Sequence, residues 1–194
     1  MGDSSDQLTT NQKIVNWAKG NLGKKIGRGL CWDLGEEALK RAGAQTSNDL
    51  GPVGEDTDYV WGDPIDALKD VQPGDLLQLR DHFVTTTTVS KYTFNDGSTI
   101  TETSESVAKR GHHTAIVNSM PTAEGMLKTY EQHVNGRDVI QKMTLYTRDI
   151  LAVTTQLTGK FTHPKTKKIE KARITKTVTV KVTGTIWAYR PKMK

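Results

Sequence analysis

Cys31 is the only cysteine in the chain, so it cannot form an internal disulfide and stays available as a thiol. It follows the turn Gly27-Arg28-Gly29 at the start of a predicted helix. The partial positive charge of a helix N-terminus favours thiolate over thiol, and its free backbone N–H groups can stabilise an oxyanion. An isolated helical cysteine is more often a small buried apolar residue. The helix start nevertheless makes Cys31 the candidate nucleophile.

A thiolate nucleophile needs a base that exchanges a proton near neutral pH, which is the chemistry of histidine. The segment Gly111–Val117 is typical of a strand and contains His112 and His113. Because side chains alternate along a strand, we expect the two histidines on opposite faces, with only one pointing at Cys31. We predict that His113 is the base and that His112 is a polar surface or rim residue.

A third group has to fix the tautomer of the histidine. The next predicted strand carries Glu131 and His133, which alternation places on one face. Either side chain could contact the second nitrogen of His113, so both remain candidates for this role. The histidines lack metal-ligand spacing and there is no second cysteine, so we do not predict a zinc site.

Two helices are expected to position the thiol. The first, capped by Thr9 or Thr10, runs through Leu22, and the second runs from Cys31 to Gly43. Residues 44–70 are predicted to be loop, and the turn Gln72-Pro73-Gly74-Asp75 precedes the first strand. Alternating and β-branched runs then predict strands at 76–80, 83–94, 98–103, 113–118, 126–133, 139–146, 152–158, 175–182 and 185–189. Hairpin turns are expected at Asn95-Asp96-Gly97 and Asn135-Gly136.

Helices followed by an antiparallel sheet place the chain in the α+β class, with the N-terminal helices packed on a central sheet. The 194 residues, 35% of them hydrophobic, fit a single domain over 1–194. We expect residues 1–8 to be disordered and residues 83–110 and 154–183 to form hairpin insertions. The second of these would be an extended β-hairpin near the C-terminus.

Five motifs are distributed along the chain: Gly29-Leu30-Cys31-Trp32-Asp33-Leu34, Pro73-Gly74-Asp75, His113-Thr114-Ala115-Ile116-Val117, Tyr130-Glu131-Gln132-His133-Val134-Asn135 and Ile186-Trp187-Ala188-Tyr189-Arg190-Pro191. The resemblance that they carry extends over most of the chain from residue 11 onward. In composition and order they resemble the CHAP amidase/peptidase domains and their NlpC-like relatives. The ordered set is far more specific than any one of the motifs.

The resemblance implies a papain-like cysteine hydrolase fold with Cys31 as nucleophile, His113 as base and Glu131 as orienting carboxylate. NlpC-like enzymes often use a histidine in the third role, which keeps His133 open. CHAP relatives typically cut peptidoglycan, so the expected substrate is peptide-like or peptidoglycan-like. The stretch before Cys31 is basic, unlike the acidic loop that some CHAP domains use for calcium, so we predict no metal and no cofactor.

The net charge of +5 is concentrated near the C-terminus. Residues 160–194 hold eleven Lys or Arg against the single acid Glu170, which leaves −5 for the first 159 residues. Such a basic segment is usually a solvated face, but it could attract an anionic surface. No nucleic-acid motif accompanies it, so no specific nucleic-acid partner is predicted.

The sequence contains no apolar run of the length that a transmembrane segment needs. The stretch Met1–Gln7 lacks the features of a secretory signal. Localisation therefore stays open between the cytoplasm, export by another route and a leader that was removed.

Two rival functions remain beside a peptidoglycan hydrolase. One is a catalytically silent binding module that keeps the fold and uses its cleft or basic hairpin to hold a partner. The other is a cytoplasmic thiol peptidase or acyl hydrolase with a substrate outside the cell wall.

Overall fold

The computed structural model describes residues 8–54 and 56–194. The chain divides into two compact units: the first contains 1–82, 110–147 and 184–194, and the second contains 83–109 and 148–183. The single domain over 1–194, with hairpin insertions at 83–110 and 154–183, stays a prediction. The disorder expected for residues 1–8 concerns, apart from Leu8, residues outside the described part of the chain.

Two helices of the first unit begin where the sequence predicts. α1 (Thr10–Gly20) starts with a capping box, in which the Thr9 hydroxyl accepts from the Gln12 backbone N–H at 3.2 Å and the Gln12 side chain accepts from the Thr9 N–H at 2.8 Å. α2 (Cys31–Ala42) ends at Gly43, whose φ of 77° is the left-handed conformation that glycine adopts without strain. A third helix, α3 (Ser47–Leu50), lies within the region predicted to be loop.

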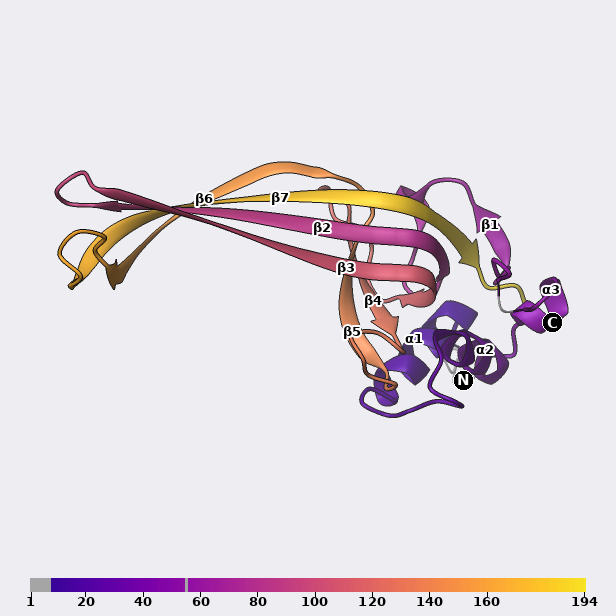
Figure 1. Ribbon diagram of the computed structural model, residues 1–194. Helices are drawn as coiled ribbons and strands as arrows, with labels where there is room; N and C mark the ends of the chain where they lie inside the picture. Colours follow the sequence, from indigo (N-terminus) through magenta and orange to yellow (C-terminus); the bar gives the residue numbers. More distant parts are fainter. Residues whose placement is uncertain (1–7, 55) are drawn as a thin grey trace, which may run out of the picture. The chain divides into compact units, whose positions relative to one another are not determined.

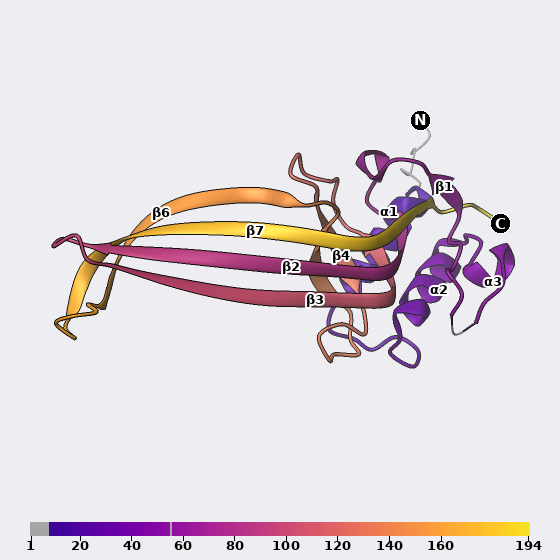
Figure 2. The same cartoon turned by 45° about the horizontal axis from the view of Figure 1, so that its top comes forward.

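The strands form one sheet. They are β1 (Asp63–Ile65), β2 (Leu76–Phe94), β3 (Thr99–Val117), β4 (Met126–Glu131), β5 (Gln141–Tyr146), β6 (Ile150–Thr162) and β7 (Ile169–Arg190). Their order across the sheet is β1-β7-β2-β3-β4-β5, and β6 pairs with β7 (Figures 1 and 2). β4 pairs antiparallel with both β3 and β5, which places Tyr130 opposite Ile116 on one side and Lys142 on the other.

Strand dominates this fold more than the sequence predicts. β2, β3 and β7 each join two runs that are predicted as separate strands. The glycine between the two runs of β7 does not end the strand: Gly184 has a φ of 88°, and a Cβ there would collide with the Asp81 carbonyl oxygen of β2. A glycine thus allows close approach of two backbones instead of marking a turn. Helices and an antiparallel sheet are both present, but the sheet is the larger part.

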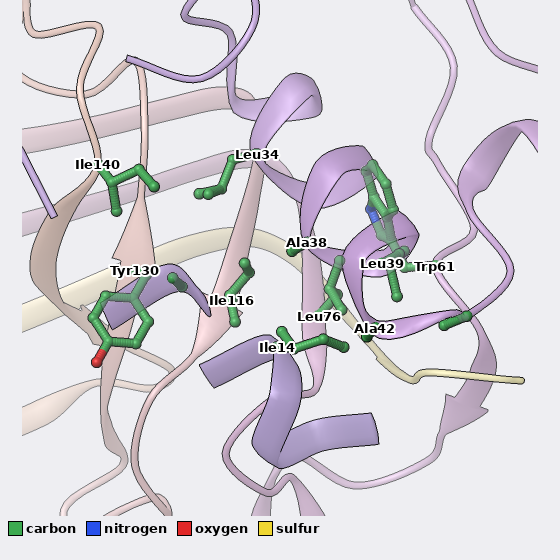
Figure 3. Close-up of a cluster of buried hydrophobic side chains, with 12 residues drawn as sticks. Ile14, Leu34, Ala38, Leu39, Ala42, Trp61, Leu76, Ile116, Tyr130 and Ile140 are labelled. Atoms are coloured by element: carbon green, nitrogen blue, oxygen red, sulfur yellow. The ribbon is translucent and has the colours of Figure 1, made fainter. Parts of the chain in front are cut away.

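The core of the first unit contains α1, α2 and one face of the sheet (Figure 3). Ile14 and Ala18 come from α1, and α2 supplies four residues at helical spacing, Leu34, Ala38, Leu39 and Ala42. They pack with Leu76, Ile116 and Tyr130 of the sheet. Fully burying a side chain such as leucine or isoleucine contributes about 1.5–3 kcal/mol, so this cluster holds the start of α2 firmly against β3 and β4.

The other face of the sheet forms a second cluster in the same unit. It uses the alternate residues of the strands, Leu77, Leu79, Ala115, Val117, Leu127, Leu145 and Ala188, together with Val71. Residues of both clusters therefore alternate along β2 and β3, as expected for strands buried on both sides. No helix in the described chain is long and apolar enough to cross a membrane.

Candidate active site

The loop before Cys31 is held in place by a buried carboxylate of the helix that it precedes. Asp33, in the first turn of α2, accepts hydrogen bonds from the backbone N–H groups of Arg28 at 2.8 Å and Leu30 at 3.2 Å. Gly27 has a φ of 55°, and a Cβ there would lie 2.8 Å from the Asp33 carboxyl carbon. The close turn and the carboxylate at the N-terminus of α2 together fix Cys31 as the first helical residue.

A second buried side chain ties the same loop to the sheet. Gln132, directly after β4, accepts from the Ile26 N–H at 2.8 Å and donates to the Ile26 and Leu30 carbonyl oxygens at 3.0 and 2.8 Å. It is fully buried, so each of these bonds forms away from bulk water. Gln132 therefore fixes the distance between the Cys31 helix and the end of β4.

Cys31 and His113 lie close enough to shift each other's pKa. Burial alone would raise the pKa of the Cys31 thiol, but the hydrogen bond and the charge of His113, with the backbone N–H groups of Thr114 and Trp32, lower it below the ordinary value. Burial alone would lower the pKa of His113, but the bonds to Cys31 and Glu131 outweigh it and raise the value to about 9. Both directions favour a thiolate beside an imidazolium.

Glu131 contacts the far side of the imidazole. Its Oε2 lies 3.1 Å from His113 Nε2, which leaves Nδ1 of the ring for the sulfur. Arg110 donates through Nε to Oε2 at 2.7 Å and through Nη2 to Oε1 at 3.2 Å, and the Thr129 hydroxyl donates to Oε1 at 2.6 Å. Burial would raise the pKa of Glu131, but the His113 hydrogen bond and the Arg110 charge lower it to about 2.

Four side chains thus form a row in which the charge alternates in sign. It runs from Cys31 through His113 and Glu131 to Arg110, and the pKa directions of the first three favour a thiolate, an imidazolium and a carboxylate. Glu131 is fully buried, and His113 and Arg110 are 4% and 5% exposed. Buried charges are costly unless each one is paired, and in this row each has an opposite neighbour.

Comparison with known families identifies the domain type. A model described as the AIM3/BBC1 cysteine proteinase-fold domain matches residues 6–193, nearly the whole chain. The chain belongs to this family. The papain-like fold expected from the sequence is therefore shown at the level of a cysteine proteinase-fold domain. No curated protein and no solved structure matches the chain.

The AIM3/BBC1 match does not test the resemblance to CHAP and NlpC-like domains that the sequence motifs indicate. It supports the cysteine proteinase fold and not membership of the CHAP or NlpC-like domains specifically. The Cys, His and Glu positions on which that resemblance rests do lie together in this AIM3/BBC1 domain. They can do so in any arrangement that puts a helix N-terminus against two adjacent antiparallel strands.

His133 does not contact His113, contrary to one of the two alternatives from the sequence. β4 ends at Glu131, and His133 has a φ of 60°, so strand alternation no longer applies to it. Its Nδ1 instead lies 2.8 Å from Asp138 Oδ1, with both side chains about half exposed. Of the two candidates, Glu131 is therefore the one that contacts the imidazole.

Strand alternation also fails in the segment that carries the two histidines. Arg110 and His113 both contact Glu131 although they are three positions apart, an odd spacing, so the period of two is broken across Gly111 and His112. His112 consequently lines the same pocket as Cys31 and is not turned away from it. It is a rim residue, as predicted, and its Nε2 lies 2.7 Å from the Thr57 carbonyl oxygen.

The Cys31 thiol opens into a pocket of about 570 Å³ in the first unit. The walls are mainly aromatic and apolar, with Arg28 at one side, and consist of Arg28, Leu30, Trp32, Val53, Gly54, Tyr59, His112 and His133. The Tyr59 ring packs edge-on against His112, with centroids 5.0 Å apart, and the Arg28 guanidinium lies over Trp32 at 5.5 Å. The pocket lining contains Arg28 but no lysine, aspartate or glutamate.

Two residues of the site were missed by the sequence reasoning. Arg110 falls at the end of the segment predicted to be a hairpin insertion, 83–110, and Gln132 lies between the two residues that competed for the orienting role. No local sequence pattern indicates that an arginine is buried before its partner is known. Gln132, by contrast, lies inside the motif Tyr130–Asn135, which could have marked it as a site residue. Among the described residues no cluster of three His, Cys, Asp or Glu side chains has the geometry of a metal site.

Proposed function

We propose that this domain is a cysteine hydrolase that cleaves amide bonds in a peptide-like substrate. The observation that carries the proposal is the row Cys31–His113–Glu131–Arg110, whose first member opens into a pocket while the other three are buried. Burying the Glu131–Arg110 ion pair beside the imidazole costs desolvation free energy that apolar residues would not cost. A purely structural role therefore explains the ion pair poorly.

The chemistry divides into acylation and deacylation. In acylation, the Cys31 thiolate attacks the carbonyl carbon, and the electron pair of the C=O bond moves to oxygen. Backbone N–H groups at the start of α2 can stabilise this oxyanion, because they have no partner within the helix. The tetrahedral intermediate collapses, the C–N bond breaks, and the His113 imidazolium gives its proton to the leaving amine. An acyl thioester on Cys31 remains.

In deacylation, His113 is neutral and takes a proton from water as the water attacks the thioester carbonyl. The second tetrahedral intermediate expels the Cys31 thiolate and releases a carboxylic acid. Glu131 stays ionised throughout and holds Nε2 of the ring, so that Nδ1 serves the reaction. Its place corresponds to that of the carboxylate in a serine or cysteine hydrolase triad.

The pocket favours an uncharged or partly apolar group next to the scissile bond. Trp32, Tyr59 and Leu30 offer apolar and aromatic surface, and Arg28 can bind a carbonyl or carboxylate at the rim. Peptides and the peptide portion of peptidoglycan both fit this description. The finer assignment to a CHAP-type peptidoglycan amidase or endopeptidase belongs to the proposal and rests on the sequence motifs.

The test is incubation with purified peptidoglycan and, separately, with a mixed peptide library, followed by mass spectrometry of the products. New amine and carboxylate termini from either substrate, absent with Cys31→Ala, support a hydrolase and show which substrate class it takes. Peptide cleavage without wall cleavage would indicate a thiol peptidase with another substrate. Intact substrates in both reactions, with an unreactive Cys31, would indicate a catalytically silent binding module.

A further inference from the structure

The β6–β7 hairpin of the second unit has an edge strand that lacks the usual protection from Val153 to Gly159. β6 pairs with β7 and with no other strand of the described chain, so half of its backbone N–H and C=O groups have no strand partner (Figures 1 and 2). Exposed edges normally carry a charge, a proline or a bulge that blocks further pairing. The ten residues 150–159 contain no charge and no proline, and the one irregularity lies between Ile150 and Val153.

The other free edge in the same unit is protected. The part of β3 that belongs to the second unit lies beyond its pairing with β4, which involves only Ile116 and Val117. This part carries Glu102, Glu105 and Lys109, all exposed. The contrast shows that the uncharged stretch 150–159, which ends before Lys160, is a property of β6 and not of the unit as a whole.

Pairing between β6 and β7 gives the hairpin two different faces. From Val153 onward the register is regular, with Val153 opposite Val178 and Leu157 opposite Ile174. One face therefore presents aliphatic side chains of both strands, interrupted on β7 by the exposed Lys176, which pairs with Thr155. On it, Val153 and Leu157 of the edge strand are 49% and 55% exposed. The exposed stripe lies where the side chains of an added strand would pack.

The opposite face is polar and basic. Lys160 pairs with Lys171, and Thr158 pairs with Arg173, so three cations gather on this face. Over residues 150–183 eight Lys or Arg stand against one acid, Glu170, a net charge of +7. None of the eight forms a salt bridge with any residue in the described part of the chain. Unpaired like charges beside an open edge favour an anionic partner over a second copy of this hairpin.

We propose that β6 is a docking edge for an extended acidic peptide segment of another protein. The segment adds to the sheet as a strand, and main-chain hydrogen bonds to β6 supply affinity. Its alternate side chains are apolar on the face of Val153 and Leu157 and acidic on the face of Lys160, Lys171 and Arg173. This binding site is separate in sequence from Cys31 and does not depend on hydrolase activity.

The test uses a fluorescent capped peptide of about eight residues that alternates valine and glutamate, a length typical of a strand. Fluorescence anisotropy with the full chain should show saturable binding that weakens as salt rises. A peptide that alternates valine and lysine should not bind. The same valine–glutamate peptide with N-methyl groups on alternate amides keeps its charge but cannot pair as a strand, and it should bind much more weakly.

Two variants separate strand addition from simple charge attraction. Leu157→Lys adds an attractive charge but removes an apolar contact and protects the edge, and we expect it to weaken binding about tenfold. Lys171→Glu should also weaken binding, and Lys19→Glu, an exposed change on α1, should not. The proposal is overturned if the N-methylated peptide binds as well as its parent, or if Leu157→Lys binds as well as or better than the unaltered chain. Binding to phosphatidylserine vesicles in place of the peptide, or self-association at the same edge, would overturn it too.

Discussion

Arg110 and Glu131 form a buried bidentate ion pair, and the Glu131 oxygen that lies 2.7 Å from Arg110 Nε also lies 3.1 Å from His113 Nε2. The Glu131 carboxylate therefore interacts with both Arg110 and His113. Removing one of them changes the environment of the other, so the stability of the fold and the reactivity of Cys31 are coupled at this point. The predictions below use that coupling.

Arg110→Met should lower the free energy of unfolding by about 3–5 kcal/mol, because it leaves the Glu131 carboxylate buried without its bidentate partner. The double variant Arg110→Met with Glu131→Gln removes both charges and should regain most of that loss. Denaturant unfolding of the single and double variants measures the pair. Lys109→Met, an exposed neighbour, is the control and should change stability little. Equal losses in single and double variants would show that the pair is not coupled.

The same double variant should slow alkylation of Cys31 by iodoacetamide at neutral pH. Without the carboxylate, His113 loses the negative charge that helps to raise its pKa, so less imidazolium remains to stabilise the thiolate. Because the double variant is expected to stay folded, a slower rate reports on reactivity and not on unfolding. An unchanged rate would mean that Glu131 has no influence on the thiol.

Comparing His133→Ala with the Glu131 variants tests which residue orients the imidazole. His133 pairs with Asp138 at the surface, so its loss should cost at most about 1 kcal/mol of stability and leave the alkylation rate of Cys31 nearly unchanged. It can alter substrate affinity, since it lines the pocket. A fall in alkylation rate as large as that of the Glu131 variants would contradict the assignment.

Gln132→Leu should destabilise the protein by about 1–3 kcal/mol, since it leaves the Ile26 and Leu30 backbone groups without partners. It should also reduce turnover, because the loop that sets the position of Cys31 loses its tie to β4. Thermal unfolding and kcat on a cleaved substrate are the two readouts. Gln141→Leu, which removes a single bond to Val134, is the matched control. Full turnover in Gln132→Leu would show that the loop keeps its position without this side chain.

Turnover should follow a bell-shaped pH profile. On the acid side, activity rises as Cys31 forms its thiolate, at a pH below that of an ordinary thiol. On the alkaline side, the leaving amine needs a proton from the imidazolium, which is lost as pH rises through about 9, so activity falls there. Initial rates of kcat/KM across pH test both limbs. A single rise that continues above pH 9 would contradict the role of His113 as the acid.

Local pattern was enough to predict the start of α2 and the position of Cys31, because a turn with two glycines and a helical apolar stripe are signals within one segment. The contact between His113 and Glu131 could be predicted as one of two alternatives, since strand pairing brings the residues together. The end of β4 at Glu131 decides between them, and it depends on the left-handed backbone at His133, which no pattern indicates.

The burial of Arg110 could not be predicted from the sequence. Its threonine-rich segment is predicted only as a hairpin insertion, with no buried residue singled out, yet the Arg110 side chain is buried because Glu131 lies across from it. Burial of a charge depends on a partner distant in sequence, so local composition gives no indication of it. The merging of predicted strands in β2, β3 and β7 has a similar cause, because pairing with a neighbour overrides a local break.

The most direct test of the thiolate–imidazolium pair is the pH titration of thiolate ultraviolet absorbance, with Cys31→Ser as the blank. The account predicts that absorbance is already present at neutral pH, with a midpoint well below that of a free cysteine. It also predicts that the midpoint rises when Arg110 and Glu131 are replaced together. A midpoint at or above the ordinary thiol value would contradict the account, because Cys31 would then be an unactivated side chain in a pocket.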